Sequence, residues 1–162
     1  MHTFTVTNKY NQFIQAQMHK EKPDETKLIE LGGLIRQNYE LVVHREPILL
    51  FDKNDGHLVK SAIYISEQEF KDHIIHVPDI LFYVGYVMWI FEIDGWIHNV
   101  KNRVIVRDER RNECYKTAKL NFRIFNEMEI LLKQGKEPKR PATADEVFQE
   151  VKIELNIITQ NK

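Results

Sequence analysis

Cysteine is almost absent from this sequence: Cys114 is the single cysteine among 162 residues. One thiol cannot form an intramolecular disulfide, and it does not make a structural zinc site. The amino-terminal residues also lack the basic stretch and apolar core of a secretory signal. We therefore expect a cytoplasmic protein that works in the reducing interior of its own cell or of a host cell.

Long hydrophobic runs and recognised catalytic signatures are missing as well. A membrane-spanning helix needs about 18 or more apolar residues, and the apolar run of residues 80–91 is followed by Glu92 and Asp94. The six glycines form neither a phosphate-binding loop nor a dinucleotide-binding fingerprint, and the chain has no nucleophile elbow. These absences predict no membrane association and no cofactor, and they argue against an enzyme.

Charge is nearly balanced overall but uneven along the chain. The sequence has 23 Lys and Arg against 24 Asp and Glu, so its net charge gives no general attraction to nucleic acid. Residues 61–100 contain one basic and six acidic residues, whereas residues 101–162 contain 14 basic and ten acidic residues. This complementary distribution predicts a homodimer or a larger homo-oligomer.

Residues 80–100 are expected to form the centre of the fold. They could form a buried helix after Pro78-Asp79, or two strands. The hairpin is favoured because β-branched and aromatic residues are frequent and because Asp94-Gly95 is a strong turn signal. In that register Ile93 lies opposite Trp96. A core face would carry Val87, Trp89, Phe91, Ile93, Trp96, His98 and Val100, and an amphipathic face Tyr86, Met88, Ile90, Glu92, Ile97, Asn99 and Lys101.

The first half of the chain shows five further patterns. Residues 2–7 alternate like a short strand, and residues 8–20 change to helical spacing. Asp24 can cap a second helix, whose buried stripe would be Leu28, Leu31, Ile35, Tyr39 and Val42. A hairpin is predicted over residues 47–65, with its turn at residues 53–56. Ser66 and Glu69 match a capping box that opens a helix over residues 67–76.

The second half predicts one strand and two helices. Residues 99–107 could continue the β region as a further strand. A long helix is expected from residue 108 to Gly135, with Cys114, Ala118, Phe122, Phe125, Met128 and Leu132 on one face. Residues 136–142 read as an exposed linker. Thr143 and Glu146 then match a second capping box that opens a terminal helix, although residues 151–158 also alternate like an edge strand.

Together these elements predict an α+β fold in a single domain that spans residues 1–162. A central antiparallel sheet is built from the two hairpins. The two N-terminal helices, the long C-terminal helix and the terminal helix pack on it.

Residues 72–79 hold the densest group of potential metal ligands: Asp72, His73, His76 and Asp79. On the helix predicted there, the spacings of three and four residues would place the first three on one side. The string Asp72-His73-Ile74 with a following proline resembles the start of the HNH nuclease signature. That resemblance implies a histidine that activates water against a metal-held phosphate, but no histidine follows His98. We expect partly exposed histidines at a helix end, and no metal site.

Two other groups could carry chemistry. Glu92, Asp94 and His98 lie close together in the predicted hairpin and could form an acid/base group, although Glu92 would face away from His98. Residues 101–123 are rich in basic side chains: Lys101, Arg103, Arg107, Arg110, Arg111, Lys116, Lys119 and Arg123. This segment could bind nucleic acid through phosphates, or it could bind a protein.

We expect a small, non-enzymatic accessory protein, of phage or bacterial type, that acts by binding an unknown protein partner. The partner-binding residues would be Lys101, Arg103, Arg107, Arg110 and Arg111, since arginine is enriched at interface hot spots. The alternative is nucleic-acid binding through residues 101–123, with a metal-dependent nuclease of HNH type as its enzymatic form.

Overall fold

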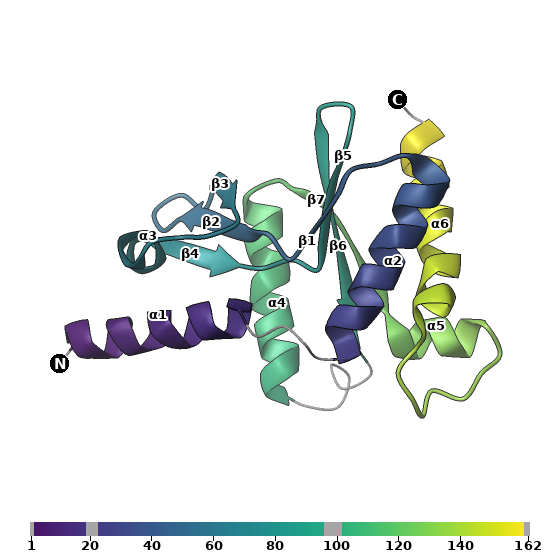
Figure 1. Cartoon of the computed structure of the whole chain (residues 1–162), viewed down its shortest axis with the longest axis horizontal. Coiled ribbons are helices and arrows are strands. Elements are labelled where there is room, and N and C mark those ends of the chain that lie inside the picture. The colour runs from purple at the N-terminus through teal and green to yellow at the C-terminus, as the bar shows by residue number, and fades with distance from the viewer. Residues whose placement is uncertain (1, 19–22, 96–101, 161–162) are drawn as a thin grey trace.

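The computed structural model describes residues 2–18, 23–95 and 102–160 (Figure 1). Its helices are α1 (His2–Met18), α2 (Pro23–Tyr39), α3 (Glu67–Asp72), α4 (Asn102–Thr117), α5 (Glu127–Lys133) and α6 (Ala144–Gln160). Its strands are β1 (Val43–Arg45), β2 (Ile48–Asp52), β3 (Leu58–Ala62), β4 (His73–His76), β5 (Ile80–Val84), β6 (Val87–Asp94) and β7 (Asn121–Asn126).

The strands form two sheets, and the α+β class is confirmed. One sheet has the order β1-β5-β6-β7 and the other the order β3-β2-β4. β6 and β7 are parallel and are joined through α4, which makes a β-α-β unit, whereas all other strand pairs are antiparallel. The larger sheet is therefore mixed, and the hairpin of residues 47–65 belongs to a separate sheet. Both points differ from the single antiparallel sheet that the sequence predicted.

Helices cover both faces of the larger sheet. In Figure 1, α2 and α6 lie side by side on one side of it and α4 lies on the other. The α2/α6 side contains Phe82, Phe91 and Leu155, and the α4 side contains Leu81, Ile90 and Tyr115. Because both faces are buried, residues 80–91 read as a continuous apolar run. The prediction of one core face and one amphipathic face was wrong, since Ile90 and Phe91 are equally inaccessible to solvent.

The strand interpretation of residues 80–93 is confirmed, but the predicted turn was misplaced. Val84 pairs with Val87, so the two-residue turn is Gly85-Tyr86. Gly85 has a φ of 62°, a conformation that such a turn requires and glycine adopts without strain. Asp94 ends β6. Trp96, which was expected to lie opposite Ile93, is outside the described residues.

The N-terminal predictions were correct for the helices and wrong for the strand. Residues 2–7 belong to α1, because extending an existing helix adds a hydrogen bond per residue, whereas a strand needs a partner edge. In α2, Leu28, Leu31 and Ile35 are buried as predicted, but Val42 lies after the helix and is 70% exposed.

Both capping boxes are present. Ser66 and Glu69 exchange hydrogen bonds of 3.1 and 3.0 Å at the start of α3. Thr143 and Glu146 do the same with 3.2 and 2.8 Å at the start of α6. Residues 151–158 are therefore helical, and the edge-strand alternative is wrong. The preceding loop is tied to α6, because Arg140 and Lys136 both contact the Glu146 carboxylate.

Three helix and strand boundaries differ from the predictions, and in two of them strand pairing overrides the local pattern. The helix expected over residues 67–76 ends at Asp72, and residues 73–76 become β4, which pairs with β2. Residues 102–107 are helical in α4, not a strand. The long helix expected from residue 108 to 135 is divided into α4, β7 and α5, since β7 fills the parallel position beside β6. Lys119, with a φ of 58°, lies at the first break.

No helix in the described ranges is long and apolar enough to cross a membrane.

Candidate acidic site

Three carboxylates meet where β5 begins and β6 ends. The register that pairs Ile80 with Phe91 places Asp79 opposite Glu92. The Asp79 N–H donates to Glu92 Oε1 at 2.8 Å, and the Ile93 N–H donates to Asp79 Oδ2 at 2.6 Å. Asp94 lies two residues after Glu92 and therefore on the same face of β6. The backbone of the hairpin thus fixes all three acids on the α4 side of the sheet.

Helix α4 supplies the groups that contact these acids. Arg111 donates from Nη1 and Nη2 to the two carboxylate oxygens of Asp94, at 3.1 and 3.2 Å. Its Nε lies 3.1 Å from Glu92 Oε2. One turn later, the Tyr115 hydroxyl donates to the same Glu92 oxygen at 3.0 Å. One turn earlier, Asp108 lies 3.4 Å from Arg111 Nη1.

Among the residues whose side chains the structure describes, acids outnumber cations in this group, which we call the acidic site (Asp79, Glu92, Asp94, Asp108, Arg111 and Tyr115). Glu92 and Asp94 are 2% and 7% exposed. Loss of hydration raises the pKa of Glu92 to about 7, although Arg111 favours its charged form. Burial and the neighbouring Glu92 raise the pKa of Asp79 well above its ordinary value. Buried charge of one sign is costly unless it is compensated, so the site favours a proton or a further cation.

Unfolding at several pH values should reveal the raised pKa of Glu92. A carboxyl whose pKa rises from 4.5 to about 7 on folding stabilises the folded state below pH 4.5, and this stabilisation is lost as the pH rises towards 7. Glu92→Gln removes this titration. We expect the unfolding free energy of the variant to fall less steeply between pH 5 and 7, by up to about 1.4 kcal/mol per pH unit.

Urea unfolding at fixed pH values measures this slope. Glu113→Gln is the matched control, because Glu113 is exposed on α4, and it should keep the wild-type slope. Equal slopes for wild type and Glu92→Gln would show that Glu92 titrates normally.

The acidic site lies at the carboxyl end of a parallel strand pair. β6 and β7 run side by side, and their last residues, Asp94 and Asn126, are paired. Asn126 also caps α5 by accepting the Glu129 N–H at 3.1 Å. Ligand sites of open α/β sheets lie at the carboxyl ends of the strands, so the position of these acids is typical of a binding site.

The proposed metal candidates of residues 72–79 do not come together. Asp72 ends α3 and accepts a hydrogen bond from Gln68, whereas His73 bonds the Glu69 carbonyl. On β4, residues 73 and 76 point to opposite faces. His76 packs against Phe51 and Tyr115, and burial lowers its pKa. Residues 73–76 are a strand and not helical, so the spacing that would place Asp72, His73 and His76 on one side of a helix does not apply, and only Asp79 belongs to the acidic site.

The predicted acid/base group is present in part. Glu92 and Asp94 lie on one face, and Asp94 belongs to β6, not to a turn. His98 lies outside the described residues. Sequence reasoning missed the pairing of Asp79 with Glu92 and the contribution of Tyr115. The available signal was the position of Asp79 and Glu92 at the two ends of one apolar run.

The basic segment is divided between surface and interior. Arg107 and Arg110 are exposed on α4, whereas the Arg111 side chain is 12% exposed and is held by Glu92 and Asp94. Arg123 stacks over Trp89, with its guanidinium carbon 5.0 Å from the ring centroid. Lys101 lies outside the described residues, and the side chain of Arg103 does so too. Arg111 is therefore not part of an exposed arginine cluster.

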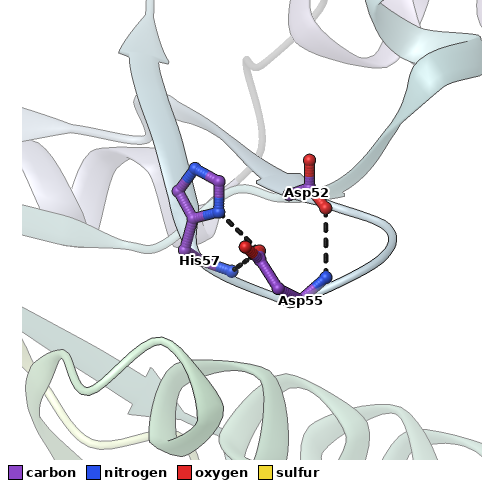
Figure 2. Close-up of side chains that lie close together, drawn as sticks. All are labelled: Asp52, Asp55 and His57. Atoms are coloured by element: carbon purple, nitrogen blue, oxygen red, sulfur yellow. Dashed lines mark hydrogen bonds and ion pairs between the residues drawn. The ribbon is translucent and has the colours of Figure 1, made fainter.

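A second acidic group lies in the turn between β2 and β3 (Figure 2). Within the described ranges, Asp52, Asp55 and His57 are the three potential ligands whose atoms lie within 4.8 Å of one another. Asp52 Oδ1 accepts the N–H groups of Asn54 and Asp55 at 2.7 and 3.1 Å. Asp55 accepts from the His57 backbone and ring, as Figure 2 shows. These bonds are those of a turn, so turn formation accounts for the group.

Comparison of the chain with protein-family models, with curated proteins and with solved structures found no match.

Proposed function

We propose that the protein is a metal-dependent phosphodiesterase that acts on nucleic acid at the acidic site. The observation that carries this proposal is the pairing of Asp79 with the buried Glu92, next to the buried Asp94. Asp79 Oδ1 accepts no hydrogen bond from any residue that the structure describes, so this oxygen is available to a ligand.

The ligand chemistry favours a hard divalent cation. The site offers carboxylate oxygens and no thiolate, which suits Mg²⁺ or Mn²⁺ better than zinc. Mg²⁺ is typically held by one or two carboxylates together with substrate phosphates. Asp79 would be a ligand through its Oδ1 atom. Glu92 would be the second ligand by exchanging one of its hydrogen bonds for the metal, because both of its oxygens accept hydrogen bonds or ion pairs, as do those of Asp94. When bound, the metal would polarise a phosphoryl oxygen and activate water.

The protein groups around these carboxylates have positioning roles. Tyr115 and Arg111 both contact Glu92 Oε2 and so fix the orientation of this carboxylate. The Ile93 N–H of β6 donates to Asp79 Oδ2 and fixes this carboxylate. A ligand set held in this way costs little reorganisation when substrate binds.

The surface near the site suits a phosphate polymer. Arg107 and Arg110 are exposed on α4, the helix that also carries Arg111, and Lys116 and Lys119 follow at and beyond its end. Basic side chains bind nucleic acid through its phosphates, independently of sequence. The proposal departs from the expectation of a cofactor-free accessory protein, because only the folded chain brings the residues of the acidic site together.

Cleavage assays on labelled single-stranded and duplex DNA and RNA, with Mg²⁺ or Mn²⁺, test the proposal. Wild type should cleave at least one of these substrates, and a chelator should abolish cleavage. Asp79→Asn and Glu92→Gln should each lower the rate by at least about a hundredfold, since metal charge stabilisation contributes several kcal/mol.

Glu109→Gln is the matched control, because it makes the same chemical change on the exposed part of α4. It should cleave like wild type. Folding of each variant is checked by circular dichroism. Cleavage that survives in Asp79→Asn, or wild type that cleaves none of the substrates with either metal, would contradict the proposal.

A further inference from the structure

His76 ends β4 and packs against α4. It pairs with Leu49 of β2, so these two side chains lie on the same face of the three-stranded sheet. Leu49 and Phe51 belong to one buried cluster with Tyr115 of α4. The ring centroid of His76 lies 5.9 Å from that of Phe51 and 6.0 Å from that of Tyr115. The imidazole is therefore held against α4 by contacts with two aromatic rings.

Tyr115 connects this imidazole to the acidic site. Its ring packs against His76, and its hydroxyl donates to Glu92 Oε2 at 3.0 Å. Arg111 Nε lies 3.1 Å from the same oxygen, and the positive charge of Arg111 also acts on His76. Asp79 follows His76 by three residues, and its charge acts on Tyr115. His76 is therefore next to the groups that hold Glu92, one of the two proposed metal ligands.

The ring nitrogens of His76 have no hydrogen-bond partner among the residues that the structure describes. The side chain is only partly exposed, and polar groups in the interior of a protein usually have a partner. Packing against Phe51 and Tyr115 does not require nitrogen atoms, since a phenyl ring would fill the same place. An unpaired ring nitrogen beside a hydrolytic site is available to exchange a proton with water.

The surroundings of His76 favour the uncharged imidazole. Burial and the positive charge of Arg111 both lower the pKa of His76 below its ordinary value of 6.5. From α4, Arg111 and Tyr115 face the imidazole, and from β2 the apolar Leu49 and Phe51 do so. At neutral pH one ring nitrogen therefore carries a proton and the other can accept one.

We propose that His76 is the general base of the hydrolysis and takes the proton of the water that attacks phosphorus. This role rests on the proposed function and adds a proton acceptor, because carboxylates that hold a metal are not free to accept a proton. As the proton moves to His76, the water oxygen forms a bond to phosphorus, and the P–O bond to the leaving nucleoside breaks. The leaving oxygen keeps the electron pair of that bond and takes a proton from solvent, and His76 returns its own proton to solvent.

His76→Phe tests this role, because a phenyl ring keeps the contacts with Phe51 and Tyr115 but cannot accept a proton. At pH 7 and saturating Mn²⁺ we expect kcat to fall about a hundredfold, the lower end of the range for a general base, and KM to stay unchanged. The affinity for Mn²⁺, measured by electron spin resonance of the free ion, should equal that of wild type, since His76 is not a metal ligand.

The pH dependence of kcat separates a base from a residue that only packs. In wild type at saturating Mn²⁺, kcat should rise with pH up to about pH 6.5 and then level off, because only the uncharged imidazole accepts a proton. This rise should be absent from His76→Phe. Histidine NMR titration of the wild type without metal should give His76 a pKa below 6.5.

His73→Phe is the matched control. It makes the same change on the same strand, and residues 73 and 76 point to opposite faces of β4. It should keep the kcat and the pH profile of wild type. Circular dichroism checks the folding of both variants.

Separate outcomes overturn the two proposals. If wild type cleaves and His76→Phe has the same kcat and pH profile, His76 is not the base and the hydrolytic function stands. A loss of Mn²⁺ affinity in His76→Phe, or a His76 imidazole that is still charged at pH 7, would also overturn the role of His76 alone. Wild type that cleaves none of the substrates would overturn the hydrolytic function and the role of His76 together.

Discussion

Arg111→Ala should lower the free energy of unfolding by about 3–5 kcal/mol, the usual cost of removing one partner of a buried ion pair. Arg111 contacts Glu92, Asp94 and Asp108, and its side chain is 12% exposed. Without it, the buried acids lose the cation that contacts both Glu92 and Asp94, and they must either take up protons or open to water. Urea unfolding at neutral pH measures the loss.

Arg110→Ala is the control for this prediction, because it removes the same charge from the exposed part of the same helix. Its unfolding free energy should change by no more than about 0.5 kcal/mol. Equal stability of Arg111→Ala and Arg110→Ala would show that Arg111 does not compensate the acids in solution.

The result also bears on the interface hypothesis. Replacing Arg107, Arg110 and Arg111 together with alanine would also remove the ion pairs of Arg111 with Glu92 and Asp94. A loss of partner binding in that triple variant would therefore not identify an interface. Arg107→Ala with Arg110→Ala tests the surface alone. Binding to a protein partner and homo-oligomer formation stay predictions.

Phe91→Ala should destabilise the fold by about 3–5 kcal/mol, the range for removing a buried aromatic ring. Phe91 is completely buried between two other rings, with centroids 4.8 Å from Phe82 and 5.0 Å from Phe125. These three rings link β5, β6 and β7 on the α2/α6 side. Thermal and urea unfolding should show the loss, and the slope against urea should be unchanged if unfolding is still two-state.

Tyr86→Ala is the control for Phe91, since Tyr86 lies in the turn of the same hairpin and is fully exposed. We expect a change within about 0.5 kcal/mol. A similar loss in both variants would mean that the hairpin is held by its turn rather than by the aromatic contacts.

Local signals were interpreted correctly where the interacting groups lie within a few residues of one another. The two capping boxes and the turn between β2 and β3 are examples, because their hydrogen bonds join residues two or three positions apart. The patterns failed where a strand needed a distant partner. β4 exists because β2 offers an edge to residues 73–76, and β7 exists because β6 offers one to residues 121–126.

The sequence by itself determined the α+β class, the terminal helix and the burial of residues 80–82 and 90–91 at the ends of the apolar run, because composition and period carry these features. The middle of that run is exposed at Tyr83, Tyr86 and Val87, since it forms the tip of the hairpin. Only the tertiary structure decided the acidic site. A turn at Asp94-Gly95 would have left Asp79 outside the hairpin, whereas the turn at Gly85-Tyr86 places it opposite Glu92. Moving a turn re-pairs every residue of both strands. Register, which depends on packing against both helical layers, therefore brought these acids together.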